Sequence, residues 1–299
     1  MDGFHILFPV SGVETSIFIP PVIAFVISYF SSMAGITGAF LILPFQMSVL
    51  GFTTPSVSAT NFLYNVVGTP GGIMRYTREG RMVWPLALAI TCGTLPGVLA
   101  GYYIRVRYLP DPKAFKLFVG IILFYIGIRV VKKIIRPART KTAKDTINFR
   151  VSNVTYNLRK MGFDFQARRV EFSLVSIFVL ALVVGVIGGI YGIGGGAIIA
   201  PFCVAFLHIP VHTVAGAAMF GTFVTSIAGV AIYSIVPFYN GQPAPPDWLL
   251  GILFGIGGFL GMYLGARSQK FIPEKTIQAI LATVIFLIAA NYILQFFNP

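Results

Sequence analysis

The chain has 299 residues, of which 56% are hydrophobic and 10% are charged. Soluble globular domains carry roughly 25% charged residues, so this composition excludes an ordinary soluble domain and predicts an integral membrane protein. The formal net charge is +13, yet more than half of the 22 Lys and Arg residues lie between Arg129 and Arg169. Such a concentration is typical of one cytoplasmic loop of a membrane protein, and no nucleic-acid partner is expected.

The first transmembrane repeat is predicted to cover residues 1–135. Its apolar segments lie at about 17–30, 39–50, 55–74, 82–103 and 113–135. The first two are separated by a break and are shorter than the roughly 20 residues that span a bilayer. They are either a re-entrant pair of half-helices or two short tilted spans, and the sequence leaves both alternatives open.

A basic cytoplasmic linker is predicted at residues 136–171. Apolar residues recur within it at intervals of four and three, which predicts an amphipathic helix with basic residues on its other face. Two placements of this helix are equally compatible with the pattern: on anionic membrane lipid, or on the protein's own cytoplasmic face. The apolar stripe consists of Ile147, Val151, Val154, Leu158 and Met161.

The second transmembrane repeat is predicted to cover residues 172–299. Its apolar segments lie at about 172–188, 197–207, 213–236, 248–266 and 274–296. The run from Tyr191 to Gly196 precedes Pro201 as the run from Ala34 to Ala39 precedes Pro44. Around these prolines Gly35, Ile36, Gly38, Ile42 and Phe45 match Gly192, Ile193, Gly195, Ile199 and Phe202 in order. This ordered match predicts an internal duplication.

Each half has five apolar segments. An odd number of membrane crossings in the first half turns the second copy upside down relative to the first. The predicted fold class is therefore an all-α integral membrane protein, built from two inverted-topology repeats with broken or re-entrant half-helices near the midplane. The positive-inside bias places the linker in the cytoplasm and both termini outside the cytoplasmic membrane. Other basic residues then also face the cytoplasm, among them Arg75, Arg78, Arg81 and Arg267.

The two breaks form the predicted binding site. Non-helical backbone at membrane depth persists only where protein buries it or where it lines a wet cavity. Three consecutive glycines exceed what helix packing is expected to require, and a helix that starts after them directs free N–H groups toward an anion. The alternative, that the glycines only allow helices to approach closely, stays open. The candidate residues are Thr37, Gly38, Gly192, Gly194, Gly195 and Gly196.

Polar side chains in the third segment of each half complete the candidate site. They are Thr60, Asn61, Asn65, Thr222, Thr225 and Ser226. Such groups donate hydrogen bonds to an oxyanion without carrying charge, but they also commonly bond between transmembrane helices, so both roles stay open. Glycines spaced by four are predicted instead to be packing faces. These are Gly93, Gly97 and Gly101, and Gly257, Gly261 and Gly265.

No metal, cofactor or catalytic group is predicted. Cys92 and Cys203 lie within apolar runs, and Pro210 interrupts the helix that would bring His208 and His212 to one face. No nucleophile with a neighbouring base is apparent, so an enzyme is not expected. The nine acidic residues all lie in the tail, in loops or at span ends, whereas proton and sodium coupling usually use intramembrane carboxylates. We therefore hypothesise anion export that is uncoupled or weakly coupled.

Several motifs resemble the TauE/SafE sulfite exporter family, also called the toluene-sulfonate uptake permease family. They are the run from Gly192 to Gly196 with Pro201, the run from Ser58 to Asn61, and Gly80-Arg81 with Trp84. The sequence departs from the family pattern at Thr37 and Ala39, where glycines are expected, and at Ala217-Ala218.

The resemblance implies a transporter of sulfite, sulfonates, sulfoacetate or other small oxyanions across the cytoplasmic membrane, in most members an exporter. The expected partners are a small anionic substrate and membrane lipid, and the sequence is compatible with a homo-oligomer. Two alternatives stay open: an importer or channel-like permease for sulfate, thiosulfate or small carboxylates, and a membrane enzyme or scaffold that transports nothing.

Overall fold

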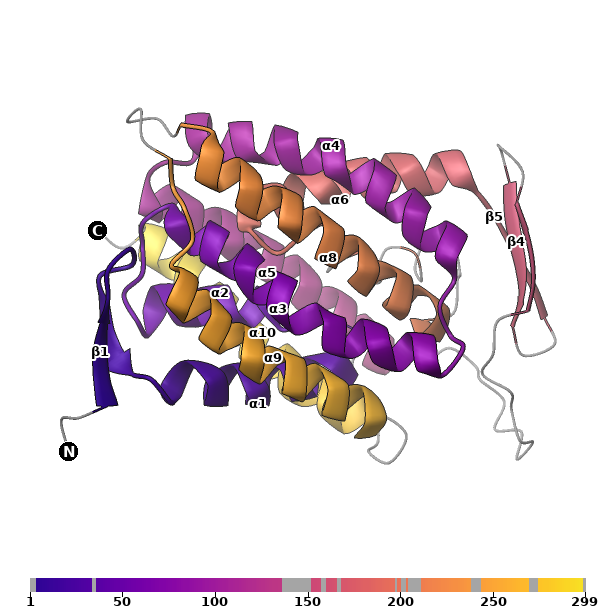
Figure 1. Ribbon diagram of the computed structural model, residues 1–299, viewed down its shortest axis with the longest axis horizontal. Helices are drawn as coiled ribbons and strands as arrows, with labels where there is room; N and C mark the ends of the chain where they lie inside the picture. The colour runs from indigo at the N-terminus through magenta and orange to yellow at the C-terminus, as the bar shows by residue number, and fades with distance from the viewer. Residues whose placement is uncertain are drawn as a thin grey trace.

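A computed structural model of the chain describes residues 4–33, 36–135, 152–156, 160–165, 168–196, 198–199, 203, 211–237, 243–268 and 274–297. The described chain is mostly helical, and helices from the two halves of the sequence pack into one bundle (Figure 1). The helices are α1 (Ile19–Met33), α2 (Ala39–Ser48), α3 (Ser56–Arg78), α4 (Trp84–Tyr108), α5 (Pro112–Ile135), α6 (Leu174–Tyr191), α8 (Val211–Ile235), α9 (Trp248–Ser268) and α10 (Glu274–Phe297). The strands are β1 (His5–Phe8), β2 (Val13–Ser16), β3 (Ser152–Tyr156), β4 (Lys160–Phe165) and β5 (Arg168–Ser173).

The apolar segments predicted in the first half, and four of the five in the second, form helices close to the expected bounds. Five of the described helices are long and apolar enough to cross a membrane: α4, α5, α6, α8 and α9. The two pieces before and after the first break are short, with 15 residues in α1 and 10 in α2, as expected. Most of the predicted segment at 197–207 lies outside the described residues.

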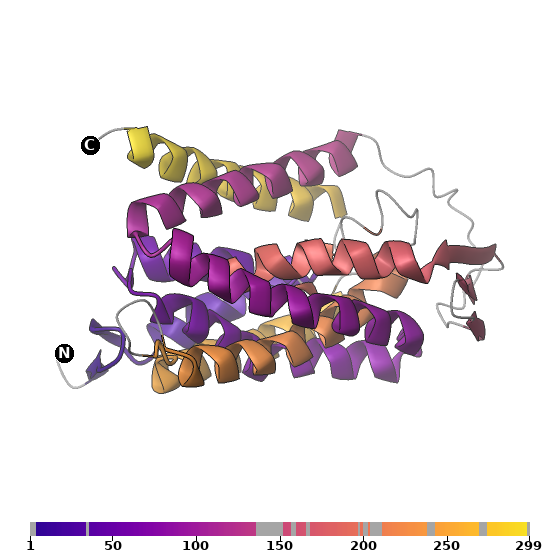
Figure 2. The same ribbon diagram turned by 90° about the horizontal axis from the view of Figure 1, so that it is seen from above.

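Each long helix of one half packs mainly on a helix of the other half. Helix α4 lies along α6 and α9 lies along α1, while α3 contacts both α8 and α9. Helices α5 and α10 form a separate pair on one side of the bundle (Figure 2). Helix α4 also contacts α8. If α6, α8, α9 and α10 are second copies of α1, α3, α4 and α5, each of these contacts maps onto itself or onto another of them.

The glycines spaced by four form the predicted packing faces. A Cβ atom built on Gly97 would lie 2.5 Å from the carbonyl oxygen of Leu182 in α6, and one built on Gly261 would lie 2.4 Å from that of Phe25 in α1. Contacts this short leave no room for any side chain, so the two backbones touch. In hydrocarbon such close approach replaces the hydrophobic effect as the source of helix association.

A short hairpin precedes α1, in the tail before the first apolar segment. Its strands β1 and β2 pair around a turn in which Gly12 adopts φ +68°. The hairpin is tied to the start of α9, because the backbone N–H and the hydroxyl of Ser11 both donate to Oδ2 of Asp247, at 3.0 and 2.8 Å. Asp247 is almost fully buried and also caps α9, where its Oδ1 accepts from the N–H of Leu250 at 3.2 Å.

The amphipathic helix predicted in the linker is wrong for the residues that the structure describes. Val154 lies in β3 and Met161 in β4, the central strand of an antiparallel sheet in the order β3-β4-β5. Met161 and Phe163 alternate with polar residues and are buried, which is the period of two that a strand requires. The other three residues of the predicted stripe, Ile147, Val151 and Leu158, lie outside the described residues.

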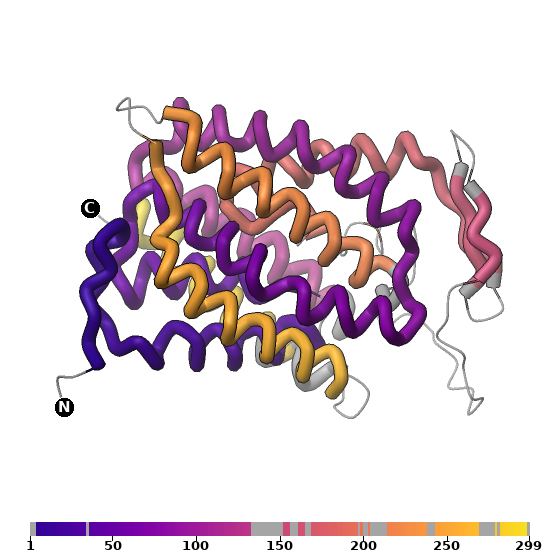
Figure 3. The backbone as a smooth tube through the Cα atoms, in the orientation of Figure 1, coloured from indigo at the N-terminus to yellow at the C-terminus, as the bar shows by residue number. Residues whose placement is uncertain are grey.

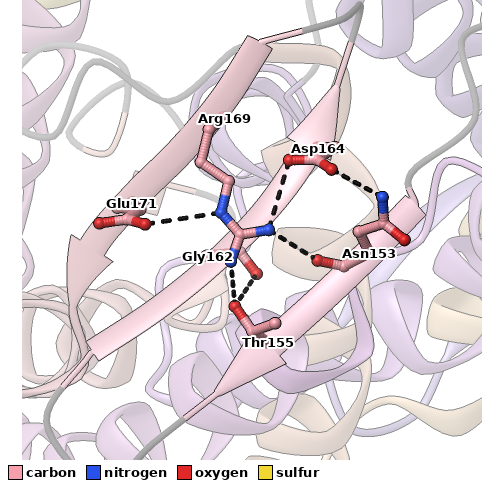
Figure 4. A network of polar contacts seen from close by, with 6 residues as sticks. All are labelled: Asn153, Thr155, Gly162, Asp164, Arg169 and Glu171. Atoms are coloured by element: carbon pink, nitrogen blue, oxygen red, sulfur yellow. Dashed lines mark hydrogen bonds and ion pairs between the residues drawn. The ribbon is translucent and has the colours of Figure 1, made fainter.

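Polar contacts hold the exposed face of this sheet (Figure 4). Arg169 of β5 reaches across the sheet to Oδ1 of Asp164 at 3.3 Å and to the carbonyl oxygen of Asn153 at 3.0 Å. The amide of Asn153 donates to Asp164 Oδ2 at 2.8 Å. This hydrogen bond, together with Arg169, lowers the pKa of Asp164. The contribution of Asp164 to sheet stability is therefore present at neutral pH and is lost as the pH falls through that lowered pKa.

The two ends of the bundle differ in what they carry. The start of α1 and the end of α10 lie at one end, and the three-stranded sheet extends from the other (Figures 1 and 3). The end that carries the sheet also holds the junction of α3 and α4, where Glu79 forms ion pairs with Arg75 and Arg81. These basic residues therefore gather at the same end as the basic linker.

The packing faces predict a sharp difference between two glycine-to-alanine variants. A Cβ atom at Gly101 would lie 2.4 Å from the carbonyl oxygen of Val186, whereas one at Gly68 meets nothing closer than 3.5 Å. We expect Gly101→Ala to destabilise the protein by about 1–3 kcal/mol through overpacking, and Gly68→Ala to be close to neutral. Thermal unfolding in detergent measures both. Equal effects of the two variants would contradict the backbone contact between α4 and α6.

Candidate functional site

Helix α6 ends at the predicted glycine break. Gly192 adopts φ +83° and Gly194 φ +72°, a left-handed conformation that glycine enters without strain. The N–H groups of Gly192 and Ile193 both point back to the carbonyl oxygen of Gly188, at 2.9 and 3.1 Å. The backbone therefore turns out of the helix at Gly192, and the carbonyl groups of Gly192 and Ile193 lose their helical partners.

Two asparagines of α3 supply partners for these carbonyl groups. The Nδ2 atom of Asn61 donates to the carbonyl oxygen of Gly192 at 3.1 Å, and that of Asn65 donates to the carbonyl oxygen of Ile193 at 3.0 Å. Both side chains are fully buried. An unpaired backbone carbonyl group is costly where water is excluded. These asparagines therefore stabilise the break by pairing its carbonyl groups.

The first break lies against the second. The same Nδ2 atom of Asn61 also donates to the carbonyl oxygen of Ala39, at 3.1 Å, and the hydroxyl of Tyr191 donates to the carbonyl oxygen of Phe40 at 2.7 Å. Ala39 and Phe40 begin α2, so the end of α6 meets the start of α2. One asparagine thus bridges two breaks that are far apart in the sequence.

Three helices close around the glycine run. A Cβ atom at Gly192 would lie 2.7 Å from Cα of Ser58 in α3, and one at Gly195 would lie 2.4 Å from Cγ2 of Thr94 in α4. On the third side, a Cβ atom at Gly196 would lie 1.9 Å from the carbonyl oxygen of Ala218 in α8. Packing therefore requires glycine at each of these positions, two of which belong to the three consecutive glycines, so close packing accounts for more of the glycine run than expected.

The candidate residues of the first break are also close-packed. Gly38 caps α2 in an ordinary right-handed conformation, and a Cβ atom there would lie 2.7 Å from the hydroxyl of Tyr64. That hydroxyl is hydrogen-bonded to Ser28 Oγ at 2.8 Å. Thr37 beside it is buried, and within the part of the chain that the structure describes its hydroxyl has no partner. Gly35 lies outside the described residues.

Two of the candidate threonines are engaged by backbone away from the breaks. The hydroxyl of Thr60 donates to the carbonyl oxygen of Ser56 at 2.9 Å and accepts from the N–H of Asp247 at 2.9 Å. The hydroxyl of Thr225 donates to the carbonyl oxygen of Gly221 in its own helix. These two residues are therefore given structural roles, whereas the structure brings Asn61 and Asn65 to the breaks.

Thr222 and Ser226 line the α8 side of the glycine run. A Cβ atom at Gly194 would lie 3.0 Å from Ser226 Oγ, and one at Gly196 would lie 2.5 Å from Thr222 Oγ1. Thr222 donates to the carbonyl oxygen of Ala218 at 3.0 Å. Ser226 is fully buried, and its hydroxyl has no partner among the described residues. This hydroxyl therefore faces the break and is able to form a further hydrogen bond.

Four of the candidate residues at the two breaks therefore have a buried polar atom that lacks a partner within the described chain. These atoms are Asn61 Oδ1, Asn65 Oδ1, Thr37 Oγ1 and Ser226 Oγ. The turn that follows the break starts helical at Gly196, and the first N–H groups of any helix have no acceptor within it. Unpaired buried groups are rare in native proteins, so their concentration here indicates a place for a polar ligand or for water.

The sequence did not single out the two tyrosines that organise this site. Tyr191 and Tyr64 are fully buried. The hydroxyl of Tyr191 donates to Phe40 at the start of α2, and the hydroxyl of Tyr64 is hydrogen-bonded to Ser28 beside Gly38. Tyr191 directly precedes the glycine run, which is a signal that the sequence contained. No group of His, Cys, Asp and Glu side chains suited to a metal ion occurs among the described residues, and the side chains of His208 and His212 lie outside them.

The comparison with protein families agrees with the motifs. The sequence model described as "Sulfite exporter TauE/SafE" matches residues 21–292. The chain belongs to the TauE/SafE sulfite exporter family. The match runs from α1 into α10, so it includes both breaks of this TauE/SafE protein and all five helices of spanning length. The resemblance predicted from the glycine run and the Ser58–Asn61 motif is confirmed.

Similar curated proteins are called probable membrane transporter proteins. "Probable membrane transporter protein YunE" of Bacillus subtilis (strain 168) is 24% identical over 271 residues, which cover 88% of this chain and 92% of that protein. "Probable membrane transporter protein ORF9" of Sinorhizobium sp is 23% identical over 93% of this chain and 92% of that protein. "Probable membrane transporter protein YdhB" of Bacillus subtilis (strain 168) is 28% identical over 40% of this chain and 46% of that protein. No solved structure shows a significant match.

The two asparagines give a matched test of how the breaks are closed. Asn61→Ala removes two hydrogen bonds to backbone carbonyl groups, whereas Asn65→Ala removes one. A hydrogen bond within a protein contributes about 0.5–1.5 kcal/mol, so we expect Asn61→Ala to lower the free energy of unfolding by more than Asn65→Ala. Unfolding curves in detergent give the comparison. An equal or smaller effect of Asn61→Ala would show that Asn61 does not bridge the breaks.

Proposed function

We propose that this TauE/SafE protein is a secondary transporter that exports a small anion, such as sulfite or an organosulfonate, across the cytoplasmic membrane. The anion binds where the two breaks meet. The observation that carries the proposal is the hydrogen bonding of Asn61 to both breaks at once, which puts the two irregular segments into one buried place lined by unpaired polar atoms.

The chemistry of the unpaired atoms favours a small oxyanion. Thr37 and Ser226 offer hydroxyl donors, and a helix that starts at Gly196, where the backbone is helical, would direct its first N–H groups and its positive end toward the same place. Asn61 and Asn65 offer carbonyl oxygens, which accept. A monoanion that keeps one hydrogen, such as hydrogensulfite, satisfies donors and acceptors together. No fixed positive charge lies among these groups, which keeps binding weak enough for release.

The helix contacts support two repeats of inverted topology. The pairs α4–α6 and α1–α9 exchange under the predicted duplication, as do α4–α8 and α3–α9, while α3–α8 and α5–α10 map onto themselves. This reciprocity is the contact pattern of a two-fold axis that relates two copies. In transporters of this kind one repeat moves against the other around a site at the midplane, which is where the breaks are proposed to lie.

The distribution of charged residues supports a proposed orientation of the protein in the membrane and a proposed direction of transport. We propose that the end of the bundle with the three-stranded sheet, where Arg75 and Arg81 gather, faces the cytoplasm. None of the described acidic residues lies within the helices of spanning length, so the described chain offers no carboxylate for proton or sodium coupling. The inside-negative membrane potential, worth about 2.3 kcal/mol per charge per 100 mV, then drives an anion outward.

Ser226→Ala is the variant that tests the site. Its hydroxyl bonds to no described residue, so its removal is expected to leave stability unchanged while it weakens anion binding. A hydrogen bond to a charged group is worth about 1.5–3 kcal/mol, which predicts a rise in the KM for flux of about tenfold or more. Flux is measured in proteoliposomes with sulfite, sulfate, thiosulfate, sulfoacetate and lactate.

Ser234→Ala is the matched control, because this serine is also on α8, also lacks a partner in the described chain and lies two helical turns from Ser226. We expect it to transport as the wild type does. Normal flux in both variants would place the anion elsewhere. Inward or non-saturating flux would favour the importer or channel, and the absence of flux for every anion would favour a membrane enzyme or scaffold.

A further inference from the structure

Arg105 is a buried arginine that has no hydrogen-bond partner in the part of the chain that the structure describes. It lies in the last turn of α4 with an exposed fraction of 0%, and among the described residues none of its three guanidinium nitrogens has a hydrogen-bond partner. Arg107, two residues further on, is exposed. Ionisable groups buried at membrane depth are costly and are usually kept for function, so this guanidinium needs an explanation.

The ordinary explanations for an arginine near a helix end do not apply to Arg105. A long basic side chain usually extends to water, but Arg105 does not reach the surface. Among the described residues Arg105 forms no ion pair: Asp111 interacts with it electrostatically, but the Oδ2 atom of Asp111 caps α5 through the N–H of Ala114 at 2.9 Å. The ring of Phe115 lies against the guanidinium, with 3.8 Å between the ring centroid and the guanidinium carbon, and this contact leaves the guanidinium N–H groups without an oxygen acceptor in the described chain.

The other polar groups around Arg105 are already engaged. The hydroxyl of Tyr102 donates to the carbonyl oxygens of Val236 and Pro237, at 2.8 and 3.1 Å. The hydroxyl of Tyr233 donates to the carbonyl oxygen of Gly189 at 3.3 Å. What remains free is a planar set of donors in a shell of aromatic rings, and a small oxyanion, which presents two acceptor oxygens side by side, fits such a set.

Tyr233 connects this place to the glycine break. Its ring packs on Tyr102 with 4.8 Å between centroids, and its hydroxyl reaches Gly189, which lies in the last turn of α6 before Gly192. Arg105 also lies at the end of α4 that is opposite the three-stranded sheet (Figure 1). The guanidinium therefore stands between the break and the end of the bundle that is proposed to face outward.

We propose that Arg105 binds a small oxyanion in a second site, enclosed by the ends of α4, α5 and α8, distinct from the groups at the two breaks. This inference rests on the proposed function, because the ligand of the Arg105 site is the exported anion as it moves from the breaks toward the outside. An anion there supplies the charge and the acceptors that the described chain does not supply to Arg105.

The test measures binding separately from flux. Purified protein in detergent is titrated with sulfite, with sodium chloride replaced so that ionic strength is constant, and anion binding is followed as a rise in Tm. We expect the wild type and Arg107→Gln to be stabilised alike, and Arg105→Gln to need at least about tenfold more sulfite for the same shift. Arg105→Lys keeps the charge but not the planar fork, so it should bind several-fold more weakly than the wild type.

Each outcome decides between the two proposals. If Arg105→Gln, or Arg105→Lys where the glutamine variant does not fold, binds sulfite as the wild type does, the second site is wrong while the proposed export still stands on its flux data. If no anion of the flux panel stabilises the wild type, the second site is also wrong. If stabilisation depends on Arg105 but no anion crosses the proteoliposome membrane, the site stands and the export does not.

Discussion

The hydrogen bonding of interrupted backbone is the constraint on which the rest of this structure depends. Where α6 ends at Gly192 and α2 begins at Ala39, carbonyl groups face a region in which water is not freely available. Asn61 donates to the carbonyl oxygens of Ala39 and Gly192, at 3.1 Å each, and Asn65 donates to that of Ile193. Without these amides the carbonyl groups of Gly192 and Ile193 would be costly unpaired groups. The breaks are therefore held together by a side chain from a third helix and do not fold as independent units.

The glycines allow the helices to approach one another closely. Asn61 reaches both breaks only because α3, α4 and α8 approach the glycine run closely, with a position for Cβ at Gly196 only 1.9 Å from the carbonyl oxygen of Ala218. The same principle acts along α4 and α6 and along α9 and α1, where glycines let backbones touch. Several buried polar side chains still lack a partner in the described chain, among them Ser226 and Arg105, and the two proposals rest on these two.

The second half lacks the asparagine that the duplication would place opposite Asn61, since Ala218 stands there. The structure shows what this asymmetry does: Asn61 alone serves both breaks, while the α8 side contributes hydroxyl groups and a backbone carbonyl. The hydrogen bonding around the two breaks is therefore asymmetric.

Much of the fold follows from the sequence alone, because hydrocarbon imposes strong local rules. Segment lengths, the two breaks and the packing faces of the glycines spaced by four were all predictable, since a membrane-spanning helix must satisfy its own backbone and be long enough to cross. The linker was not: the intervals between Val154 and Met161 suggested a helix, but pairing with β5 decided for a sheet. Which polar residues serve structure and which stay free was also decided only by the tertiary fold. Thr60 and Ser226 look alike in the sequence, and they differ because Thr60 meets the N–H of Asp247 whereas Ser226 meets no partner in the described chain.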